Sequence, residues 1–288
     1  MKRKLFSRSD ADVPDVRPSL IAGQWYPGVP DRLRDSVQAF LDAAQVEPCD
    51  GRLVALVAPH AGHRYSAGVA AHGFRLVAGA DYDIVAIVAP YHPFYVSSTP
   101  YLVPDYAAYW TPLGEIPLAD KLVSELDARL GLTRVQRDEE HSLEIQLPFL
   151  QVALPGSFQL LPVMLNDQSA EVCSALGEAL AEVLRGQNAL LVASTDLSHH
   201  YSAETAARLD GAVTGRIAAF DPEGLLDVLA TGKGQACGGG PTVAVMLAAR
   251  ALGANRAQLL KYATSGDVTG DYGSVVGYAA AALYAAEH

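Results

Sequence analysis

The chain has 288 residues, of which half are hydrophobic and 18% are charged, and its formal net charge is -11. This composition excludes a disordered chain and a coiled coil, and the acidic balance argues against nucleic acid as a partner. No apolar run is long enough to span a bilayer, and aspartates rather than an apolar segment follow the basic residues near the start. Neither a membrane span nor a secretory signal is therefore expected.

Helix-like and strand-like segments alternate along the whole chain. Pro30 is expected to open the first helix, and Pro148 is expected to break or kink a later one. In chain order, the apolar runs and the 3.6-residue periodicity predict a helix from Pro30, a strand over 53–58, a helix over 67–77, a strand over 84–89, helices over 118–130 and 139–153, a strand over 158–165, a helix over 170–184, a strand over 190–193, helices over 202–220, 225–229 and 241–252, and strands over 259–263 and 275–284.

Continuous apolar strands separated by helices are typical of a sheet that is covered on both faces. We therefore predict one α/β domain over residues 17–288, with three α/β/α layers and a largely parallel or mixed central sheet. Residues 1–16 are interpreted as a flexible charged tail. Residues 91–110, rich in tyrosine and proline, are expected to form a long ordered surface segment near the functional site.

The three cysteines lie far apart in the sequence and do not form a disulfide framework. This pattern fits a reducing, cytoplasmic environment. Cys173 falls on the apolar face of the helix over 170–184, which indicates a structural role, and Cys49 falls in a loop. Only Cys237 has neighbours that indicate chemistry.

Histidines follow the ends of several predicted strands. His60 ends one apolar run, His92 ends the next, and His199 and His200 end a third. In open parallel sheets, ligands bind outside the carboxyl ends of the strands. A single histidine in such a loop most often hydrogen-bonds a carbonyl or faces water, but their shared position predicts one common cleft.

Cys237 precedes three glycines and Pro241, at the expected start of a helix. The amides and the dipole of a helix start would lower the pKa of its thiol. The thiolate is either a metal ligand or a nucleophile, and the alternative is a buried structural cysteine. Together with the imidazoles of His60 and His92, it makes a three-ligand set for zinc, iron or copper with an open coordination position.

Several further residues are candidates for roles around this set. His199 is predicted to act as a general acid or base, oriented by Asp196. His141 and Glu144 are three residues apart and share a helix face, so they could line the cleft or support a ligand. Glu139 and Glu140 are assigned to the first turn of that helix, where the dipole favours acids.

Several motifs in order resemble the Memo family, and the resemblance covers nearly the whole chain from about Arg17. They are Ala-Gly-Gln-Trp-Tyr-Pro at 22–27, Ala-Pro-His-Ala-Gly at 58–62, Glu-His-Ser-Leu-Glu at 140–144, Ser-Thr-Asp-Leu-Ser-His at 194–199, Cys-Gly at 237–238, Ser-Gly-Asp at 265–267 and Val-Val-Gly-Tyr at 275–278. The resemblance implies a fold like that of the LigB-type class III extradiol dioxygenases, which bind non-haem iron.

In the Memo pattern the metal-ligand positions correspond to His60, His92 and Cys237, and further cleft residues correspond to Trp25 and His199. Iron is the first expectation for the metal, with zinc and copper as alternatives. The bacterial relatives are named after a three-part AmmeMemoRadiSam system, which implies a radical-SAM protein as partner. Tyr91 departs from the family pattern on one side of the cleft, and a thiolate replaces the carboxylate of the dioxygenases.

Three functional hypotheses follow from the sequence. The first is an iron-dependent oxidoreductase that acts on a small substrate, with an aromatic molecule as one option. The second is a protein that binds a metal or a peptide without turnover, with tyrosines such as Tyr91 and Tyr95 forming the contact surface. The third is a metal-free enzyme in which His199 activates Cys237 as a nucleophile.

Overall fold

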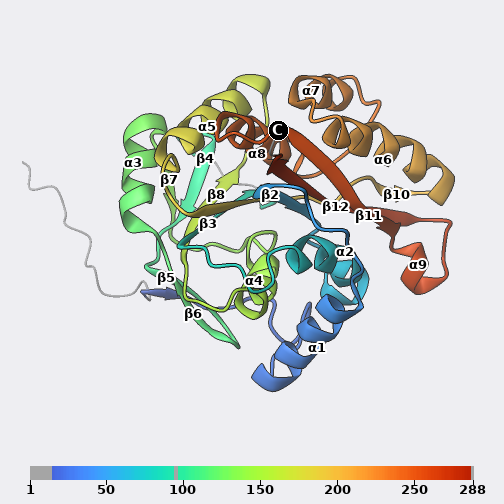
Figure 1. Ribbon diagram of the computed structural model, residues 1–288, viewed down its shortest axis with the longest axis horizontal. Helices are drawn as coiled ribbons and strands as arrows, with labels where there is room; N and C mark the ends of the chain where they lie inside the picture. Colours follow the sequence, from blue (N-terminus) through green and yellow to red (C-terminus); the bar gives the residue numbers. More distant parts are fainter. Residues whose placement is uncertain (1–14, 94–96, 287–288) are drawn as a thin grey trace, which may run out of the picture.

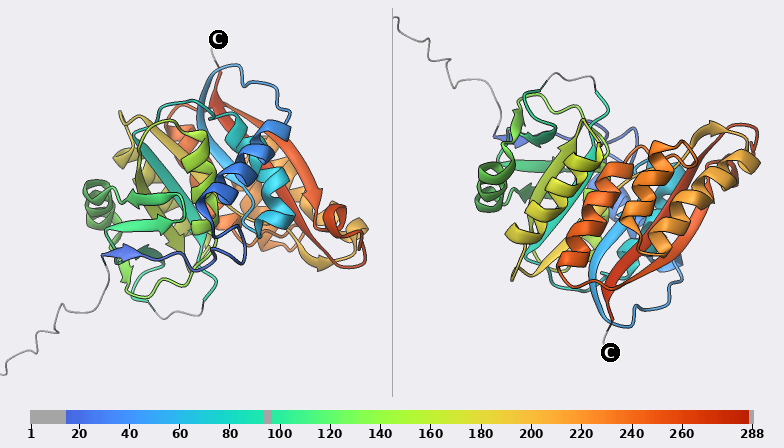
Figure 2. Two further views of the ribbon diagram at one scale, coloured as in Figure 1. Left: turned by 90° about the horizontal axis from the view of Figure 1, so that it is seen from below. Right: turned by 90° about the horizontal axis from the view of Figure 1, so that it is seen from above.

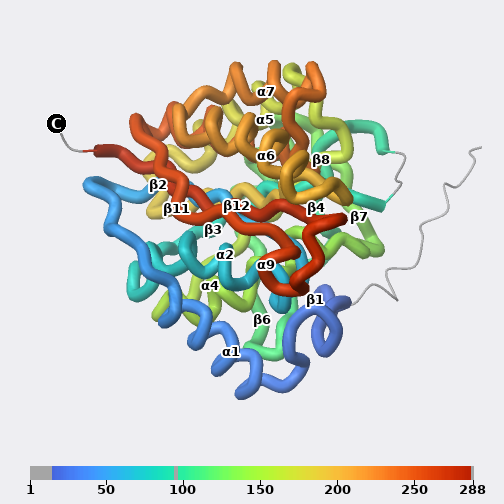
Figure 3. The backbone as a smooth tube through the Cα atoms, turned by 90° about the vertical axis from the view of Figure 1, so that its right-hand side faces the viewer, coloured from blue at the N-terminus to red at the C-terminus, as the bar shows by residue number. Residues whose placement is uncertain are grey.

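The computed structural model describes residues 15–93 and 97–286, in which helices cover both faces of a central sheet (Figure 1). Helices α1 (Pro30–Ala43), α2 (His63–Arg75) and α4 (Leu147–Ala153) cover one face. The tube view shows α5, α6 and α7 on the opposite face (Figure 3). The predicted three-layer α/β/α class is confirmed.

The second layer covers the opposite face of the sheet and contains most of the helices of the carboxyl-terminal half (Figure 2). Its members and the short helix α9 are α3 (Asp120–Leu130), α5 (Ala170–Val183), α6 (Ala203–Ala218), α7 (Pro222–Ala230), α8 (Gly239–Ala251) and α9 (Gly266–Thr269). No helix in the described part of the chain is both long enough and apolar enough to cross a membrane.

The main sheet is mixed, with the order β10-β12-β2-β9-β3-β8-β4-β7 and with β11 paired to β12. Its centre is parallel, because β2, β9, β3 and β8 run the same way, and β12 and β4 flank this centre in antiparallel orientation. The strands are β2 (Arg52–Ala58), β3 (Ile84–Pro90), β4 (Tyr101–Pro104), β7 (Thr133–Val135), β8 (Gln159–Leu165), β9 (Ala189–Ser194), β10 (His199–Tyr201), β11 (Arg256–Thr264) and β12 (Val275–Ala285).

The amino-terminal segment joins a small second sheet. Strand β1 (Val16–Arg17) pairs with β5 (Ala108–Thr111), which pairs with β6 (Gly114–Pro117). Residues 1–14 of the predicted tail lie outside the described residues, whereas Val16 is part of β1.

The prediction of a surface segment over 91–110 is wrong for much of its length. Strand β4, within this segment, is buried in the main sheet, and β5 lies in the small sheet. The apolar run Tyr-Leu-Val at 101–103 is short enough to be overlooked between prolines, yet it forms a strand that pairs with β8 on one side and with β7 on the other. Tyr95 lies outside the described residues.

The helix predicted over 139–153 begins later than expected. Residues 139–143 are not helical, a 3-10 turn spans Glu144–Gln146, and α4 follows. Pro148 lies in the first turn of α4, where its missing N–H costs nothing, so it starts the helix rather than kinking it. The loop that results, 138–143, lies at the functional site.

Candidate metal centre

Side chains that can bind a metal or transfer a proton lie at the carboxyl ends of the parallel strands. His60 follows β2, His92 follows β3 and Asp196 follows β9. They meet at a cavity of about 800 Å³, here called the histidine cavity. Among the residues that line it are Trp25, His60, Tyr65, His92, His141 and His199. Of the other residues predicted at the site, Tyr91 and Glu144 are buried and lie outside this lining.

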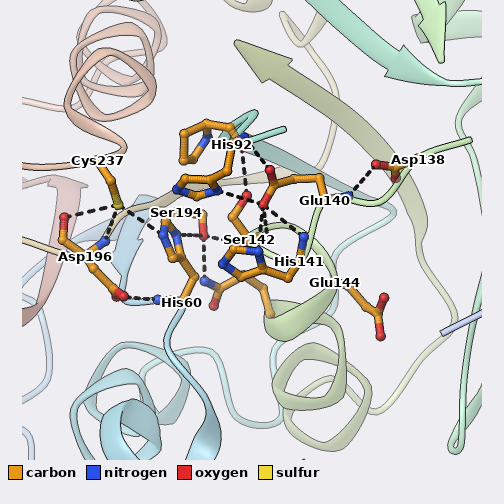
Figure 4. Close-up of polar contacts among 12 residues, drawn as sticks. His60, His92, Asp138, Glu140, His141, Ser142, Glu144, Ser194, Asp196 and Cys237 are labelled. Carbon is orange, nitrogen blue, oxygen red and sulfur yellow. Dashed lines mark hydrogen bonds and ion pairs between the residues drawn. The ribbon is translucent and has the colours of Figure 1, made fainter. Parts of the chain in front are cut away.

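Three imidazoles form a cluster that could hold a metal ion, the three-histidine cluster of His60, His92 and His141 (Figure 4). One nitrogen from each lies within 4.8 Å of the others. The His92 and His141 rings stack with centroids 4.9 Å apart, and the His60 ring meets both edge-on. The strand-end pattern predicted the convergence of His60 and His92, whereas His141 was predicted only to line the cleft or support a ligand.

Hydrogen bonds fix the tautomer of His60. Gln146 donates both to the Pro59 carbonyl, at 3.0 Å, and to Ser194 Oγ, at 2.8 Å, so its donor atom is the amide nitrogen. The Ser194 hydroxyl donates its only hydrogen to the Ser142 carbonyl, at 2.6 Å. His60 Nδ1, 3.0 Å from Ser194 Oγ, must therefore carry a hydrogen and donate it. The lone pair of His60 is left on Nε2, the atom available to a metal.

Glu140 holds the other two histidines, and sequence reasoning missed it. Its carboxylate accepts from His92 Nδ1 at 2.9 Å and from the backbone N–H groups of His92, His141 and Ser142. Burial raises the pKa of Glu140, but the bonds and charges of His92 outweigh it and hold the pKa at about 2. A carboxylate on Nδ1 that leaves Nε2 free is typical of metal-binding histidines. The signal was the polar run at 138–142, most of which falls in the helix predicted over 139–153.

Cys237 adjoins this cluster at His60. Its Sγ lies 3.0 Å from His60 Nε2, and the backbone N–H of Asp196 donates to it at 3.3 Å. The predicted low pKa is wrong: burial, together with the nearby Asp196 carboxylate, raises the pKa of Cys237 to about 12. These two effects outweigh the lowering of the thiol pKa that was expected from the start of α8. The glycines do allow a close approach, because a Cβ on Gly238 would lie 2.1 Å from the Ser194 carbonyl oxygen.

Asp196 and His199 lie at the site but do not contact each other as predicted. Asp196 Oδ1 accepts from the backbone N–H of His60 at 2.7 Å, and burial raises the pKa of this carboxyl to about 7. His199 Nδ1 donates instead to the Leu197 carbonyl at 2.8 Å, since a carbonyl can only accept. Asp196 thus positions the His60 loop, and His199 presents Nε2 as a free base.

Glu144 anchors the segment that carries Trp25. Its buried carboxylate accepts from Ser19 Oγ at 2.5 Å and from Tyr26 Oη at 2.7 Å. These bonds hold Trp25 beside the three-histidine cluster, where its ring lies 4.4 Å from that of His141. Glu144 therefore affects the cavity indirectly, because it fixes the segment that carries Trp25.

A buried arginine stabilises the loop over 138–143 through ion pairs and a hydrogen bond. Arg17 is fully buried and forms ion pairs of 2.6 Å with Asp138 and with Glu144. It also donates to the Glu140 carbonyl at 2.7 Å and lies 4.7 Å from the centre of the Tyr109 ring. Burial lowers the pKa of Arg17, but these neighbours raise it more. One cation thus balances two buried carboxylates, a role that the sequence did not suggest for this residue.

Comparisons with known proteins find matches that cover most of the chain. A family model described as "Memo-like protein" matches residues 17–282. The chain is 35% identical over 279 residues to a MEMO1 family protein of Methanopyrus kandleri, covering 92% of this chain and 97% of the relative. It is 37% identical over 273 residues to one of Methanosarcina mazei, covering 92% and 98%. A solved structure, of an uncharacterized protein from Escherichia coli K12, has a TM-score of 0.49 at 13% identity, covering 80% of this chain and 99% of that one.

Proposed function

The chain belongs to the Memo-like protein family, and from that premise we propose that it is a metal-dependent oxidoreductase with iron as its metal and a small molecule as its substrate. One observation carries the proposal: the Nδ1 atoms of His60 and His92 are engaged by Ser194 and Glu140. Their Nε2 atoms therefore carry the lone pairs that a metal would bind, at the edge of a cavity large enough for a small ligand.

The third donor is either His141 or Cys237. His141 completes the three-histidine cluster, and the sulfur of Cys237 lies beside His60 Nε2. Imidazoles suit iron, zinc and copper alike, while a thiolate favours the softer metals. When bound, an iron or copper ion would supply a Lewis acid and a one-electron redox centre.

The protein's own residues would orient the substrate and move protons. His199 lines the histidine cavity, and burial lowers its pKa, so its Nε2 is neutral and able to accept a proton near pH 7. Trp25 covers His141 and offers a flat apolar surface to a ring-shaped substrate. A small aromatic molecule fits this combination.

The test begins with metal analysis of protein purified without chelators. We expect about one equivalent of transition metal, and less than about a tenth of an equivalent would refute the metal site. Anaerobic loading with ferrous iron and an oxygen-uptake assay on catechol-like compounds then test turnover. No uptake above that of the His60→Ala variant would refute the oxidoreductase.

Cobalt loading separates the two third donors. If Cys237 is a ligand, a thiolate-to-cobalt absorption band appears in the near ultraviolet and disappears in Cys237→Ala. If His141 is the ligand instead, His141→Ala weakens cobalt binding, and Cys237→Ala leaves both spectrum and affinity unchanged. The variants also distinguish loss of metal from loss of turnover, because metal content is measured in each.

Binding without turnover is the second candidate, and exposed aromatic residues favour it. Trp25 and Tyr65, 36% and 38% exposed, lie on the histidine cavity, whereas the buried Tyr91 does not offer the contact surface first expected of it. Peptide or partner binding that is lost in Trp25→Ala, in metal-loaded protein without oxygen uptake, would favour this function. Association with a radical-SAM protein stays a proposal that co-purification from native cells can test.

A metal-free cysteine nucleophile is less well supported. The residue that contacts the Cys237 thiol is His60, not His199, and the pKa of about 12 leaves almost no thiolate at neutral pH. Catalysis by metal-free protein that is abolished in Cys237→Ala would restore this hypothesis.

A further inference from the structure

A second cavity, of about 720 Å³, reaches Cys237 from the other helix layer. We call it the cysteine cavity. Its wall comes from the start of α5, from α7 and from the loop that leads into α8, all on the face of the sheet opposite α2 and α4 (Figures 1 and 3). The histidine cavity is lined instead by the start of α2, by the loop that carries His141 and by the β11–β12 connection.

The two cavities divide the site between them. Cys237 lines the cysteine cavity and His60 lines the histidine cavity, yet Cys237 Sγ and His60 Nε2 are 3.0 Å apart. His199 lines both. The thiol–imidazole contact is therefore part of the partition between two cavities whose walls come from helices on different faces of the sheet.

The lining of the cysteine cavity defines what it can accept. Leu197, Leu226 and Leu229 supply an apolar wall, and Asp227, which is exposed, is the one lining residue with a formal charge among the described residues. No lysine or arginine of the described chain lines it, so an anion would find no cationic partner there. The histidine cavity differs, because Arg64 and several histidines line it together with Asp196 and Asp271.

The wall beside the thiol is held by specific contacts rather than by loose packing. Gln168 donates to the Cys237 carbonyl and accepts from the Gly240 N–H, each at 2.7 Å. A Cβ on Gly240 would lie 2.6 Å from Gln168 Cβ, so glycine allows this close approach. The position of Cys237 at the end of the cysteine cavity is thus set by the fold.

We propose that small uncharged molecules reach Cys237 through the cysteine cavity, by a route separate from the one that leads polar or charged ligands to the histidines. The site then has two entrances of different chemistry. In a two-substrate reaction, one entrance would admit a chelating organic molecule and the other a small neutral co-reactant. The existence of the two routes does not depend on turnover or on which metal binds.

The test measures how fast the Cys237 thiol of the metal-free full-length chain is converted to a methyl disulfide by methyl methanethiosulfonate, with methanesulfinate as the leaving group. Peptide mass spectrometry distinguishes Cys237 from Cys49, a half-buried thiol elsewhere that serves as internal reference. The anionic reagent sulfonatoethyl methanethiosulfonate is run in parallel. Relative to Cys49, we expect Cys237 to prefer the neutral reagent by about tenfold or more.

Variants that narrow each entrance locate the route. Ala230→Trp, at the exposed end of α7, narrows the cysteine cavity, and Ser274→Trp narrows the histidine cavity. Ala219→Trp, at the exposed end of α6 and in the lining of neither cavity, is the matched control for folding. Ala230→Trp should slow labelling of Cys237 severalfold and leave the rate of cobalt uptake unchanged.

Ser274→Trp should do the reverse and slow cobalt uptake without slowing the labelling of Cys237. The inference is overturned if Ser274→Trp slows thiol labelling as much as Ala230→Trp does, or if the anionic reagent labels Cys237 as fast as the neutral one. Labelling that Ala230→Trp leaves unchanged would also overturn it. A failure of metal loading alone would count against the proposed function and leave the two routes intact.

Discussion

Replacing Glu140 with glutamine tests the most specific feature of the site, the buried carboxylate that holds two histidines. The amide keeps the size of the side chain but turns one acceptor oxygen into a donor, which faces N–H groups. The pKa of Glu140 falls from 4.5 to about 2 in the folded protein, which corresponds to about 3 kcal/mol in favour of the ionised form. Because the amide oxygen retains some of the bonds, we expect Glu140→Gln to lose about 2 kcal/mol of unfolding free energy at pH 7.

The lowered pKa of Glu140 also determines how the stability of the protein changes with pH. A carboxyl group with a lowered pKa contributes stability that is present above its ordinary pKa of 4.5 and is lost as the pH falls toward 2. The difference between wild type and Glu140→Gln should therefore shrink between pH 5 and pH 3, as measured by urea unfolding of metal-free protein. Metal affinity should fall by about 10- to 100-fold.

The matched control is Glu139→Gln, which removes the same charge from the adjacent, exposed side chain. It should leave stability and metal affinity close to wild type. If Glu140→Gln behaves like Glu139→Gln in both measurements, the carboxylate does not hold the histidines and the reasoning is refuted.

Further substitutions test the rest of the site. Arg17→Met leaves two buried carboxylates without their cation and should cost about 3–5 kcal/mol in chemical denaturation; unchanged stability would contradict the ion-pair assignment. Gln146→Leu removes the bond that directs the Ser194 hydroxyl and should weaken cobalt binding at His60 by about tenfold, and wild-type affinity would show that the tautomer is not set this way. Since the pKa of Asp196 is raised to about 7, wild-type stability falls as the pH rises toward 7, so metal-free Asp196→Asn should gain about 2 kcal/mol relative to wild type between pH 5 and pH 8; a constant difference would argue against the raised pKa.

Much of the fold follows from the sequence because the parallel strands are buried on both faces. Strand β2 and strand β3 are continuous apolar runs, and their ends determine where His60 and His92 meet. The same reasoning failed for β4, since a run of only three apolar residues carries little periodic signal.

The parts of the site that the sequence did not reveal depend on partners distant in the chain. Glu140 is separated from His92 by 48 residues, and Arg17 from Glu144 by 127. No local pattern marks such pairs. Pro148 did hold a usable clue, because a proline in the first turn places the helix start near residue 147 and leaves Glu140 in a loop.

The position of β12 in the sheet bears on when the site is completed during synthesis. The three-histidine cluster comes from residues 60–141, but β12, which pairs with β2 and carries β10 on its other edge, is synthesised after all of them. Val276 and Tyr278 of β12 line the histidine cavity. A nascent chain would thus contain its metal-binding imidazoles before it has this wall of the cavity, and we expect final metal selection to await the synthesis of β12.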